Sequence, residues 1–260
     1  MAKLPIGLEL WSVRHELADD VRGTLKAVAE MGYEGVEFAG PPQHSAEELK
    51  SILDETGLAC FGWHTPFDLV QDDKLEDTIA FNKTIGNQFV IIPGLPRDRT
   101  QTRDDWLKMA GFFNELADKL APHGMRTGYH NHTVEFKPLD GENPWDTLFG
   151  NTKDEVVMQF DTGNGKFGGA DTLPILERYP GRATVLHLKP YSTTAAEEAG
   201  DPRAGFKPII GEDDLPWDDI FRVAETTGGT TIYIVEYESD AFPPLEAVDK
   251  CLKALRAMGK

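Results

Sequence analysis

Short apolar runs alternate along the whole chain with longer segments in which apolar residues recur at helical spacing. The run 6–11, for example, is followed by the helical pattern of residues 21–31, which stops before Gly32. The predicted strands are residues 6–11, 35–38, 58–64, 88–92, 125–131, 156–161, 184–189 and 231–237. The predicted helices are residues 21–31, 45–55, 75–85, 102–120, 171–179, 217–226 and 244–258. This alternation favours parallel strands joined by crossover helices.

Two architectures fit the alternation, a closed (β/α)8 barrel and an open doubly wound sheet. The open sheet usually has fewer strands and a glycine-rich phosphate turn after the first one, and no such turn follows Leu10. A (β/α)8 barrel uses about 250 residues as one unit. We therefore predict an α/β fold with a single (β/α)8 TIM barrel domain over residues 1–260. The long connection 191–217 is expected to form a loop over the barrel mouth.

Composition limits the partners more than the fold. Hydrophobic residues make up 40% of the chain, which is enough for a large core. The formal net charge of −18 argues against nucleic acid and anionic membrane surfaces as partners. Two cysteines, Cys60 and Cys251, make no disulfide framework, and the N-terminus lacks a signal-peptide pattern. We expect a cytoplasmic protein.

Residues that can carry chemistry gather where the apolar runs end. In (β/α)8 barrels the carboxyl ends of the strands converge on the face that holds the active site. At or just after those ends lie Arg14, Glu37, His64, His130, Asn131, His132, Glu135, Asp161, His187, Lys189, Glu236 and Glu238. His187 and Glu236 each follow a hydrophobic run, where a lone charge is costly unless it is paired or bound to metal. Together with Asp161 they suggest one shared site.

Several of these residues also have a purely structural interpretation. His64 can be a core histidine bonded to a carbonyl group, and Glu37 can form an ion pair with Arg14 or Lys189. Asp161 can cap a turn, since it opens the segment Asp161-Thr-Gly-Asn164. The shared placement at strand ends favours the functional interpretation for the set as a whole.

The ligand types indicate a divalent cation. Carboxylates combined with imidazole suit Mn²⁺, Mg²⁺, Zn²⁺, Co²⁺ or Fe²⁺, and no cysteine lies among the candidates. An Asp, His and Glu set leaves positions open for two substrate oxygens, so that the cation can stabilise a developing enediolate. A flanking carboxylate or imidazole can then move the proton. We predict one divalent cation as the cofactor.

Over nearly its whole length the sequence resembles the xylose isomerase-like TIM barrel superfamily. The resemblance rests on Gly7-Leu-Glu-Leu-Trp-Ser-Val-Arg14, Gly32-Tyr-Glu-Gly-Val-Glu-Phe38, Tyr129-His-Asn-His-Thr-Val-Glu-Phe136, Asp161-Thr-Gly-Asn164, His187-Leu-Lys189 and Gly211-Glu-Asp-Asp-Leu-Pro-Trp217. The superfamily contains sugar phosphate isomerases and epimerases, inosose dehydratases, hydroxypyruvate isomerases, 3-dehydroshikimate dehydratases and endonuclease IV-type nucleases. These motifs are specific for the superfamily and not for one reaction.

The resemblance implies a metal site with ligands from strands five to eight, commonly Glu, Asp, His and Glu. The last three correspond to Asp161, His187 and Glu236. His130 stands where many relatives carry the first glutamate, so either Glu135 reaches back as the fourth ligand or His130 binds the metal itself. The predicted substrate-binding residues are Arg14, Glu37, His64, Asn131, His132 and Lys189, and the predicted catalytic residues are Glu236, Glu135 and His130. Barrels of this group often self-associate, so a homo-oligomer is compatible with the resemblance.

We therefore predict a metal-dependent isomerase or epimerase that acts on a keto-sugar or keto-cyclitol through an enediolate. The same enediolate can expel a β-substituent, which gives a dehydratase or lyase acting on inosose or on 3-keto-glycosides, and His130 in place of a glutamate favours such a departure. An endonuclease IV-type phosphodiesterase would need more metal ligands and a basic surface. A non-catalytic sugar binder is the remaining alternative, and it would show ligand binding without proton exchange.

Overall fold

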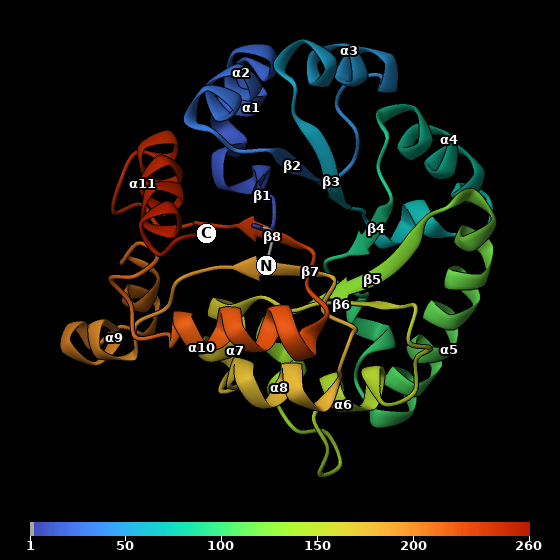
Figure 1. Ribbon diagram of the computed structural model, residues 1–260. Helices are drawn as coiled ribbons and strands as arrows, with labels where there is room; N and C mark the ends of the chain where they lie inside the picture. The colour runs from blue at the N-terminus through green and yellow to red at the C-terminus, as the bar shows by residue number, and fades with distance from the viewer. Residues whose placement is uncertain (1–2) are drawn as a thin grey trace.

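The structure is a computed structural model that describes residues 3–260 of the chain. Eight parallel strands form one sheet in the order β6-β5-β4-β3-β2-β1-β8-β7. Their bounds are β1 Ile6–Glu9, β2 Gly35–Ala39, β3 Ala59–His64, β4 Phe89–Ile92, β5 Arg126–His130, β6 Val157–Gln159, β7 Val185–Leu188 and β8 Ile232–Val235. The outer strands β6 and β7 meet through a parallel bridge between Asp161 and His187. The predicted (β/α)8 TIM barrel is confirmed, and Figure 1 shows the strands surrounded by helices.

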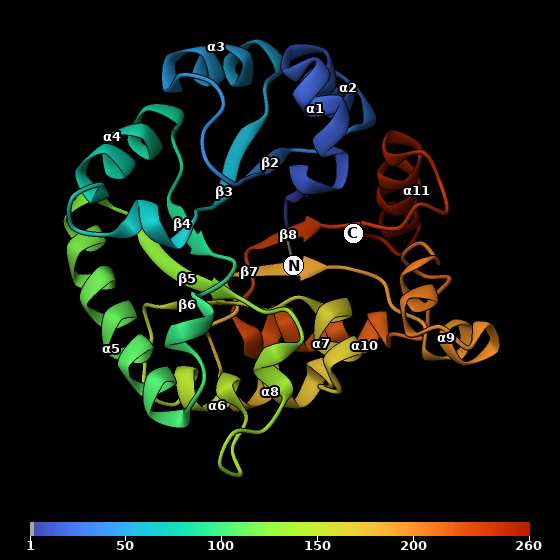
Figure 2. The same cartoon turned by 180° about the vertical axis from the view of Figure 1, so that it is seen from behind.

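The helices lie on the outside of the barrel, as Figures 1 and 2 show from its two ends. Their bounds are α1 Arg14–Asp19, α2 Val21–Met31, α3 Ala46–Thr56, α4 Leu75–Ile85, α5 Arg103–Leu120, α6 Pro144–Phe149, α7 Thr162–Gly168, α8 Thr172–Arg178, α9 Thr193–Ala199, α10 Trp217–Val223 and α11 Pro244–Ala257. The signals at their ends are local. Ser45 begins α3 by accepting the Glu48 N–H, and Gly57 ends that helix in the left-handed conformation. The predictions for 21–31 and 75–85 agree with α2 and α4.

Strands β1, β5, β6, β7 and β8 end one or two residues earlier than the sequence predicted, and in β1 and β6 a side-chain cap explains the difference. β1 stops at Glu9, because the Glu9 carboxylate accepts the Trp11 N–H at 3.3 Å and so caps a 3-10 turn over Leu10–Val13. β6 stops at Gln159, and the Asp161 carboxylate accepts the Asn164 N–H at 2.6 Å to cap α7. Each of these two capped strands therefore places a polar side chain at its carboxyl end.

The helices α1, α6, α7 and α9 were not predicted. The sequence of α7, Thr-Gly-Asn-Gly-Lys-Phe-Gly, contains three glycines and has low helix propensity. Its formation depends on the Asp161 cap and on burial of Thr162–Gly165. Tertiary context thus overrides propensity at the segment that follows a predicted metal ligand.

The connection 191–217 is not a structureless loop. It contains α9 and a 3-10 turn over Pro202–Phe206. Figures 1 and 2 show α9 at the outer edge of the molecule, while Asp201, Arg203 and Phe206 line a cavity that reaches Lys189. The segment therefore forms part of the rim of the barrel mouth.

An apolar floor fills the lower part of the barrel interior. Its buried members are Phe89, Ile91, Val157, Val185 and Ile234, and Phe61 packs against them. A Cβ atom at Gly7 or Gly35 would lie 2.7 or 2.6 Å from the Phe61 ring. These two glycines make room for a large side chain, so the floor is closely packed beneath the polar residues.

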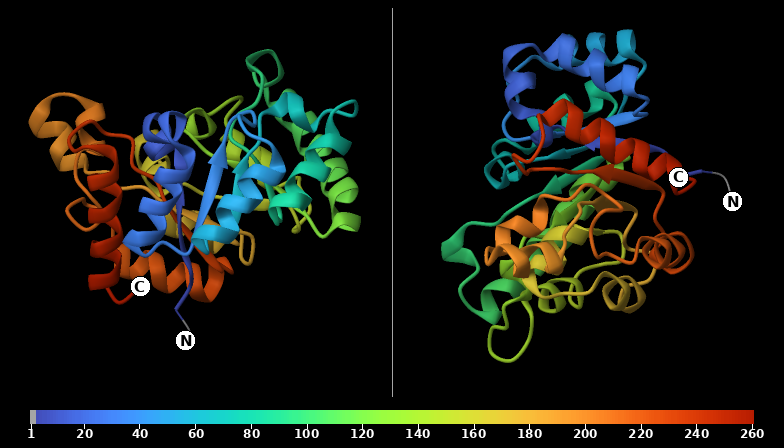
Figure 3. Two further views of the ribbon diagram at one scale, coloured as in Figure 1. Left: turned by 90° about the horizontal axis from the view of Figure 1, so that it is seen from above. Right: turned by 90° about the vertical axis from the view of Figure 1, so that its left-hand side faces the viewer.

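The C-terminus, after α11, lies at the end of the barrel where the strands begin, as the left view of Figure 3 shows. The mouth on the opposite side is therefore left to the connections that follow the strands. Across residues 3–260, no helix has both the length and the hydropathy needed to cross a bilayer.

Candidate functional site

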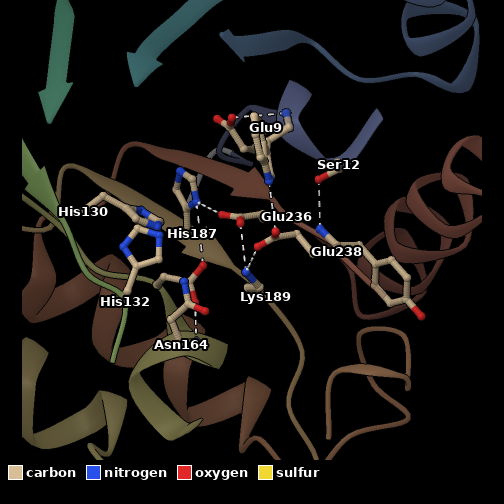
Figure 4. Close-up of polar contacts among 12 residues, drawn as sticks. Glu9, Ser12, His130, His132, Asn164, His187, Lys189, Glu236 and Glu238 are labelled. Carbon is tan, nitrogen blue, oxygen red and sulfur yellow. Dashed lines mark hydrogen bonds and ion pairs between the residues drawn. The ribbon is translucent and has the colours of Figure 1, made fainter. Parts of the chain in front are cut away.

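A layer of buried polar side chains rests on the apolar floor at the carboxyl ends of the strands. It draws on every strand or strand end except β4, and none of its members is more than 6% exposed. The members of this polar layer are Glu9, Glu37, His64, His130, Gln159, Asp161, His187, Lys189 and Glu236. Figure 4 shows part of the layer, in which side chains from distant parts of the sequence point toward one another. Such a concentration of buried charge requires mutual pairing or a bound ion.

His187 lies between two carboxylates. Its Nδ1 is 2.8 Å from Glu236 Oε2, and its Nε2 is 2.5 Å from Glu37 Oε2. Burial alone would lower the pKa of His187, but the charges of Glu37 and Glu236 and their hydrogen bonds raise it to about 10. The two nitrogens therefore contact different carboxylates, and each carboxylate helps to fix the ring.

Glu236 is held as an anion. Lys189 Nζ lies 2.9 Å from Glu236 Oε1 and also contacts Glu238. Burial would raise the pKa of Glu236, but Lys189 and His187 hold it well below its usual value. Burial would likewise lower the pKa of Lys189, whereas Glu236 and its acidic neighbours raise it. Figure 4 shows this chain of contacts from His187 through Glu236 to Lys189.

Gln159 connects the remaining histidines to Glu37. Its Nε2 donates to Glu37 Oε1 at 2.8 Å, while its Oε1 lies 2.7 Å from His64 Nε2 and 3.2 Å from His130 Nδ1. Because an amide oxygen only accepts, both ring nitrogens carry the proton in these bonds. Burial, together with the nearby His64 and His187, lowers the pKa of His130 well below its ordinary value. His130 is thus a neutral ring whose other nitrogen keeps its lone pair.

The residues fit a divalent cation. His130, Asp161, His187 and Glu236 each offer one ligand atom, and these atoms lie within 4.8 Å of one another. Asp161 Oδ2 is buried and has no hydrogen-bond partner among the described residues, and it lies 3.9 Å from His187 Nδ1. Burial raises the pKa of Asp161 to about 8. A buried, unpartnered carboxyl oxygen is costly, and a cation held by these oxygen and nitrogen ligands would satisfy it.

Two members of the polar layer, Glu9 and Gln159, were not among the predicted site residues. Glu9 pairs in register with Glu37 on the neighbouring strand, and its Oε2 is buried without a partner among residues 3–260. Burial and the charges of Glu37 and Glu236 raise the pKa of Glu9 well above its usual value. Each residue interrupts an apolar run, which was an available signal. It was missed because the predicted strands extended past these positions.

The structure separates Glu135 from the candidate ligands. Glu135 Oε1 accepts the Tyr129 hydroxyl at 2.6 Å, and Oε2 accepts the His132 N–H at 2.9 Å. Glu135 belongs to none of the groups of described residues that can hold a metal ion. The geometry therefore favours His130 over Glu135 as the ligand from the fifth strand.

The other predicted substrate residues take three different positions. His64 and His132 line a cavity of about 530 Å³ over the polar layer, together with Glu9, His130, Glu236 and Glu238. This volume is in the range of small-molecule sites. Asn131 instead holds Asp161 in place, since its Oδ1 accepts the Asp161 N–H at 2.7 Å. Arg14 lies to the side, with its guanidinium 4.9 Å from the centre of the Trp11 ring.

The fold and the polar layer together define a (β/α)8 barrel with a candidate cation site at the carboxyl ends of its strands. Residues 25–258 match the family model described as xylose isomerase-like TIM barrel, and the chain belongs to this family. The resemblance seen in the sequence is thereby confirmed.

Curated relatives include inosose dehydratases. That of Lacticaseibacillus casei is 28% identical over 266 residues, covering 89% of this chain and 88% of the relative. That of Clostridium perfringens (strain 13 / Type A) is 26% identical over 164 residues, which cover 59% of this chain and 54% of the relative. The chain thus spans about half the length of this second relative.

Solved structures show the same fold. A sugar phosphate isomerase/epimerase from Parabacteroides distasonis has a TM-score of 0.80 at 24% identity, over 99% of this chain and 95% of that one. A structure of the IolI protein with a bound zinc atom has a TM-score of 0.73 at 14% identity, over 98% of this chain and 97% of that one.

Proposed function

We propose that this protein is a divalent-cation-dependent enzyme that removes a proton next to the carbonyl group of a keto-sugar or keto-cyclitol. The observation that carries the proposal is the convergence of His130, Asp161, His187 and Glu236, with Asp161 Oδ2 buried and unpartnered among the described residues. These four residues would hold the cation. When bound, it would supply a Lewis acid for the carbonyl and hydroxyl oxygens of the substrate. The IolI structure, which has the same fold, contains a bound zinc atom, and this supports the proposal of a metal.

Glu236 and Glu9 are suited to opposite proton-transfer roles. Both line the 530 Å³ cavity, but Lys189 and His187 keep Glu236 ionised, whereas burial and the charge of Glu37 keep Glu9 protonated. Two carboxyl groups whose pKa values are displaced in opposite directions are typical of an acid and base pair. In our proposal Glu236 accepts the proton from carbon and Glu9 donates one to a substrate oxygen.

The other side chains position the substrate. Lys189 keeps Glu236 oriented through its 2.9 Å contact and so limits the directions from which a proton can be taken. His64 is fixed by Gln159 at one nitrogen, while its Nδ1 faces Glu9 at 3.9 Å. We assign His64 the task of orienting a substrate hydroxyl beside the Glu9 carboxyl group.

Elimination of a β-substituent is the branch that we favour. A separate protonated carboxyl group at Glu9 can protonate a leaving oxygen, and the curated relatives named above are inosose dehydratases. Isomerisation or epimerisation is the second candidate, and the name of the Parabacteroides distasonis structure favours it. Both branches share the first proton abstraction.

The test is NMR of inosose, ketoses and 3-keto-glucosides incubated in D₂O with Mn²⁺-loaded protein. Deuterium uptake next to the carbonyl reports proton abstraction, and loss of water or alcohol reports elimination. A chelator-treated sample and the Asp161→Asn variant serve as controls. Binding of a keto-sugar with neither exchange nor product would contradict the proposal, as would activity that survives both controls.

A further inference from the structure

A second cavity adjoins the polar one on the same face of the barrel. It has a volume of about 320 Å³ and lies between the connection after β1 and the connection after β2. Its apolar wall includes Leu10, Leu17, Phe38, Leu49 and Trp63. Connections that follow strands lie at the carboxyl ends of the strands, where active sites of (β/α)8 barrels are found. The cavity therefore belongs to the mouth of the barrel.

The two cavities share a wall made of Trp11, Ala39 and Gly40. Gly40 has a φ of 79°, a conformation that disfavours side chains, and its carbonyl oxygen accepts the Trp63 indole N–H at 2.8 Å. The backbone is thus fixed at Gly40, which adds no side chain to the wall between the cavities. A ligand whose ring lies over the polar layer can extend past this wall.

The Trp11 side chain is hydrogen-bonded and is nevertheless 46% exposed. Its indole N–H donates to Glu238 Oε2 at 3.0 Å, and its carbonyl oxygen accepts from Arg14 Nη1 at 2.9 Å. An exposed indole forfeits the stabilisation that burial would give. A ligand that covers the exposed indole of Trp11 at the junction of the two cavities would restore this stabilisation.

The lining of the second cavity selects against charged groups. Among the described residues, no Asp or Glu lines it, although the chain has a net charge of −18. Of the lining residues in this part of the chain, only Arg14 has a fixed charge, and its guanidinium already contacts Trp11. A phosphate or a second cation would find few partners there, whereas an apolar ring would be well accommodated.

We infer that this cavity is a subsite for an apolar, ring-sized substituent, so that the substrate class is a keto-glycoside with an aryl or similar leaving group. This inference rests on the proposed function, because the sugar must reach the polar layer. In the reaction the C–H bond next to the ketone breaks and Glu236 takes the proton. The bond from the β-carbon to the glycosidic oxygen then breaks, a carbon–carbon double bond forms, and Glu9 protonates the departing oxygen.

The test compares phenyl and methyl 3-keto-β-D-glucopyranoside, which differ only in the substituent. We expect the wild-type protein to bind the phenyl compound about tenfold more tightly or better by calorimetry, since the ring leaves water in the cavity. The Ala18→Phe substitution, at an exposed position of α1 that lines the cavity, should bring the affinity ratio close to one. Ala80→Phe, at an exposed position of α4 outside the cavity lining, is the matched control and should leave the ratio unchanged.

The outcomes separate this inference from the proposed function. Equal affinities in the wild-type protein, or a phenyl preference that survives Ala18→Phe, would overturn the subsite, even where metal binding and deuterium exchange occur. A phenyl preference that Ala18→Phe abolishes would support the subsite, even where exchange is absent and the proposed reaction fails.

Discussion

The two halves of the barrel mouth differ in the side chains that they present to a ligand. The half formed by β5 to β8 contributes His130, Asp161, His187 and Glu236, which crowd together around one point. The half formed by β1 to β3 contributes Glu9, Glu37 and His64 and then opens toward Trp11 and an apolar cavity. Both halves hold buried charge, but only the β1–β3 half adds an apolar cavity beside it. The difference indicates that cation binding and substrate selection can be altered separately.

The largest expected effect comes from Asp161→Asn. Loss of a carboxylate that supports a metal ligand lowers metal affinity by about 10–100-fold. Loss of a direct ligand should therefore lower metal affinity by at least ~100-fold and abolish deuterium exchange into the substrate. The new amide oxygen can still cap α7 as Oδ1 does, and the buried, unpartnered Oδ2 of an acidic group is replaced by an uncharged amide, so the metal-free variant should melt no lower than the metal-free wild-type protein. Metal analysis and thermal melting measure both, with exposed Asp171→Asn as the control. Full metal content in Asp161→Asn would break the assignment of the β5–β8 half.

Glu9→Gln should act on chemistry and not on the cation. Removing the acid should lower the rate of elimination by about 10²–10⁴-fold. With the cation held by His130, Asp161, His187 and Glu236, metal content should stay at the wild-type value, because Glu9 belongs to a different group of possible ligands, with Glu37, His64 and His187. The rate of elimination should fall further for a substrate with a poor leaving group, such as methoxide, than for one with a good leaving group, such as phenoxide. A parallel loss of metal would show that the two halves are not separable.

Glu37→Gln tests whether a residue of the β1–β3 half supports metal binding by the β5–β8 half. Glu37 faces His187 Nε2, and a carboxylate that orients a ligating histidine is worth about 10–100-fold in metal affinity. We therefore expect weaker metal binding than in Glu9→Gln, although the two carboxyl groups are neighbours in register. Calorimetric titration with Mn²⁺ compares the variants directly. Equal affinities would make Glu37 a contact of the substrate instead of a support for His187.

Metal affinity should rise with pH. The pKa of Asp161 is raised to about 8 by burial, and that of His187 to about 10 by Glu37 and Glu236 against the effect of burial. Below these values both groups carry protons that a cation must displace, so affinity should increase by about tenfold per pH unit for each proton released. The gain from Asp161 should level off above about pH 8. Titrations in buffers of different ionisation enthalpy count the protons, and a flat profile would contradict this picture.

Sequence reasoning reached the fold and the β5–β8 half more completely than the β1–β3 half. Asp161, His187 and Glu236 follow apolar runs, and that placement brings them together in any closed barrel. Glu9 was missed because its own side chain ends β1 two residues earlier than the apolar pattern implies, through its bond to the Trp11 N–H. The apolar cavity was missed because it depends on two connections that are distant in sequence, and periodicity does not report such contacts.

Glu135→Gln is expected to have only a small effect on metal affinity, and it decides the alternative that the sequence left open. One oxygen of Glu135 accepts the Tyr129 hydroxyl and the other accepts the His132 N–H, so the substitution weakens the turn that follows β5. A hydrogen bond to a charged group contributes about 1.5–3 kcal/mol, and a glutamine retains part of it, so unfolding should become easier by about 1 kcal/mol. Metal affinity should change by less than about tenfold, because an outer contact of this kind lies at the lower end of such effects. His130→Ala, measured beside it, should lose far more metal affinity, since it removes a member of the ligand group. The reverse order would make Glu135 the ligand, and it would require the turn over Val134–Phe136 to rearrange when the cation binds.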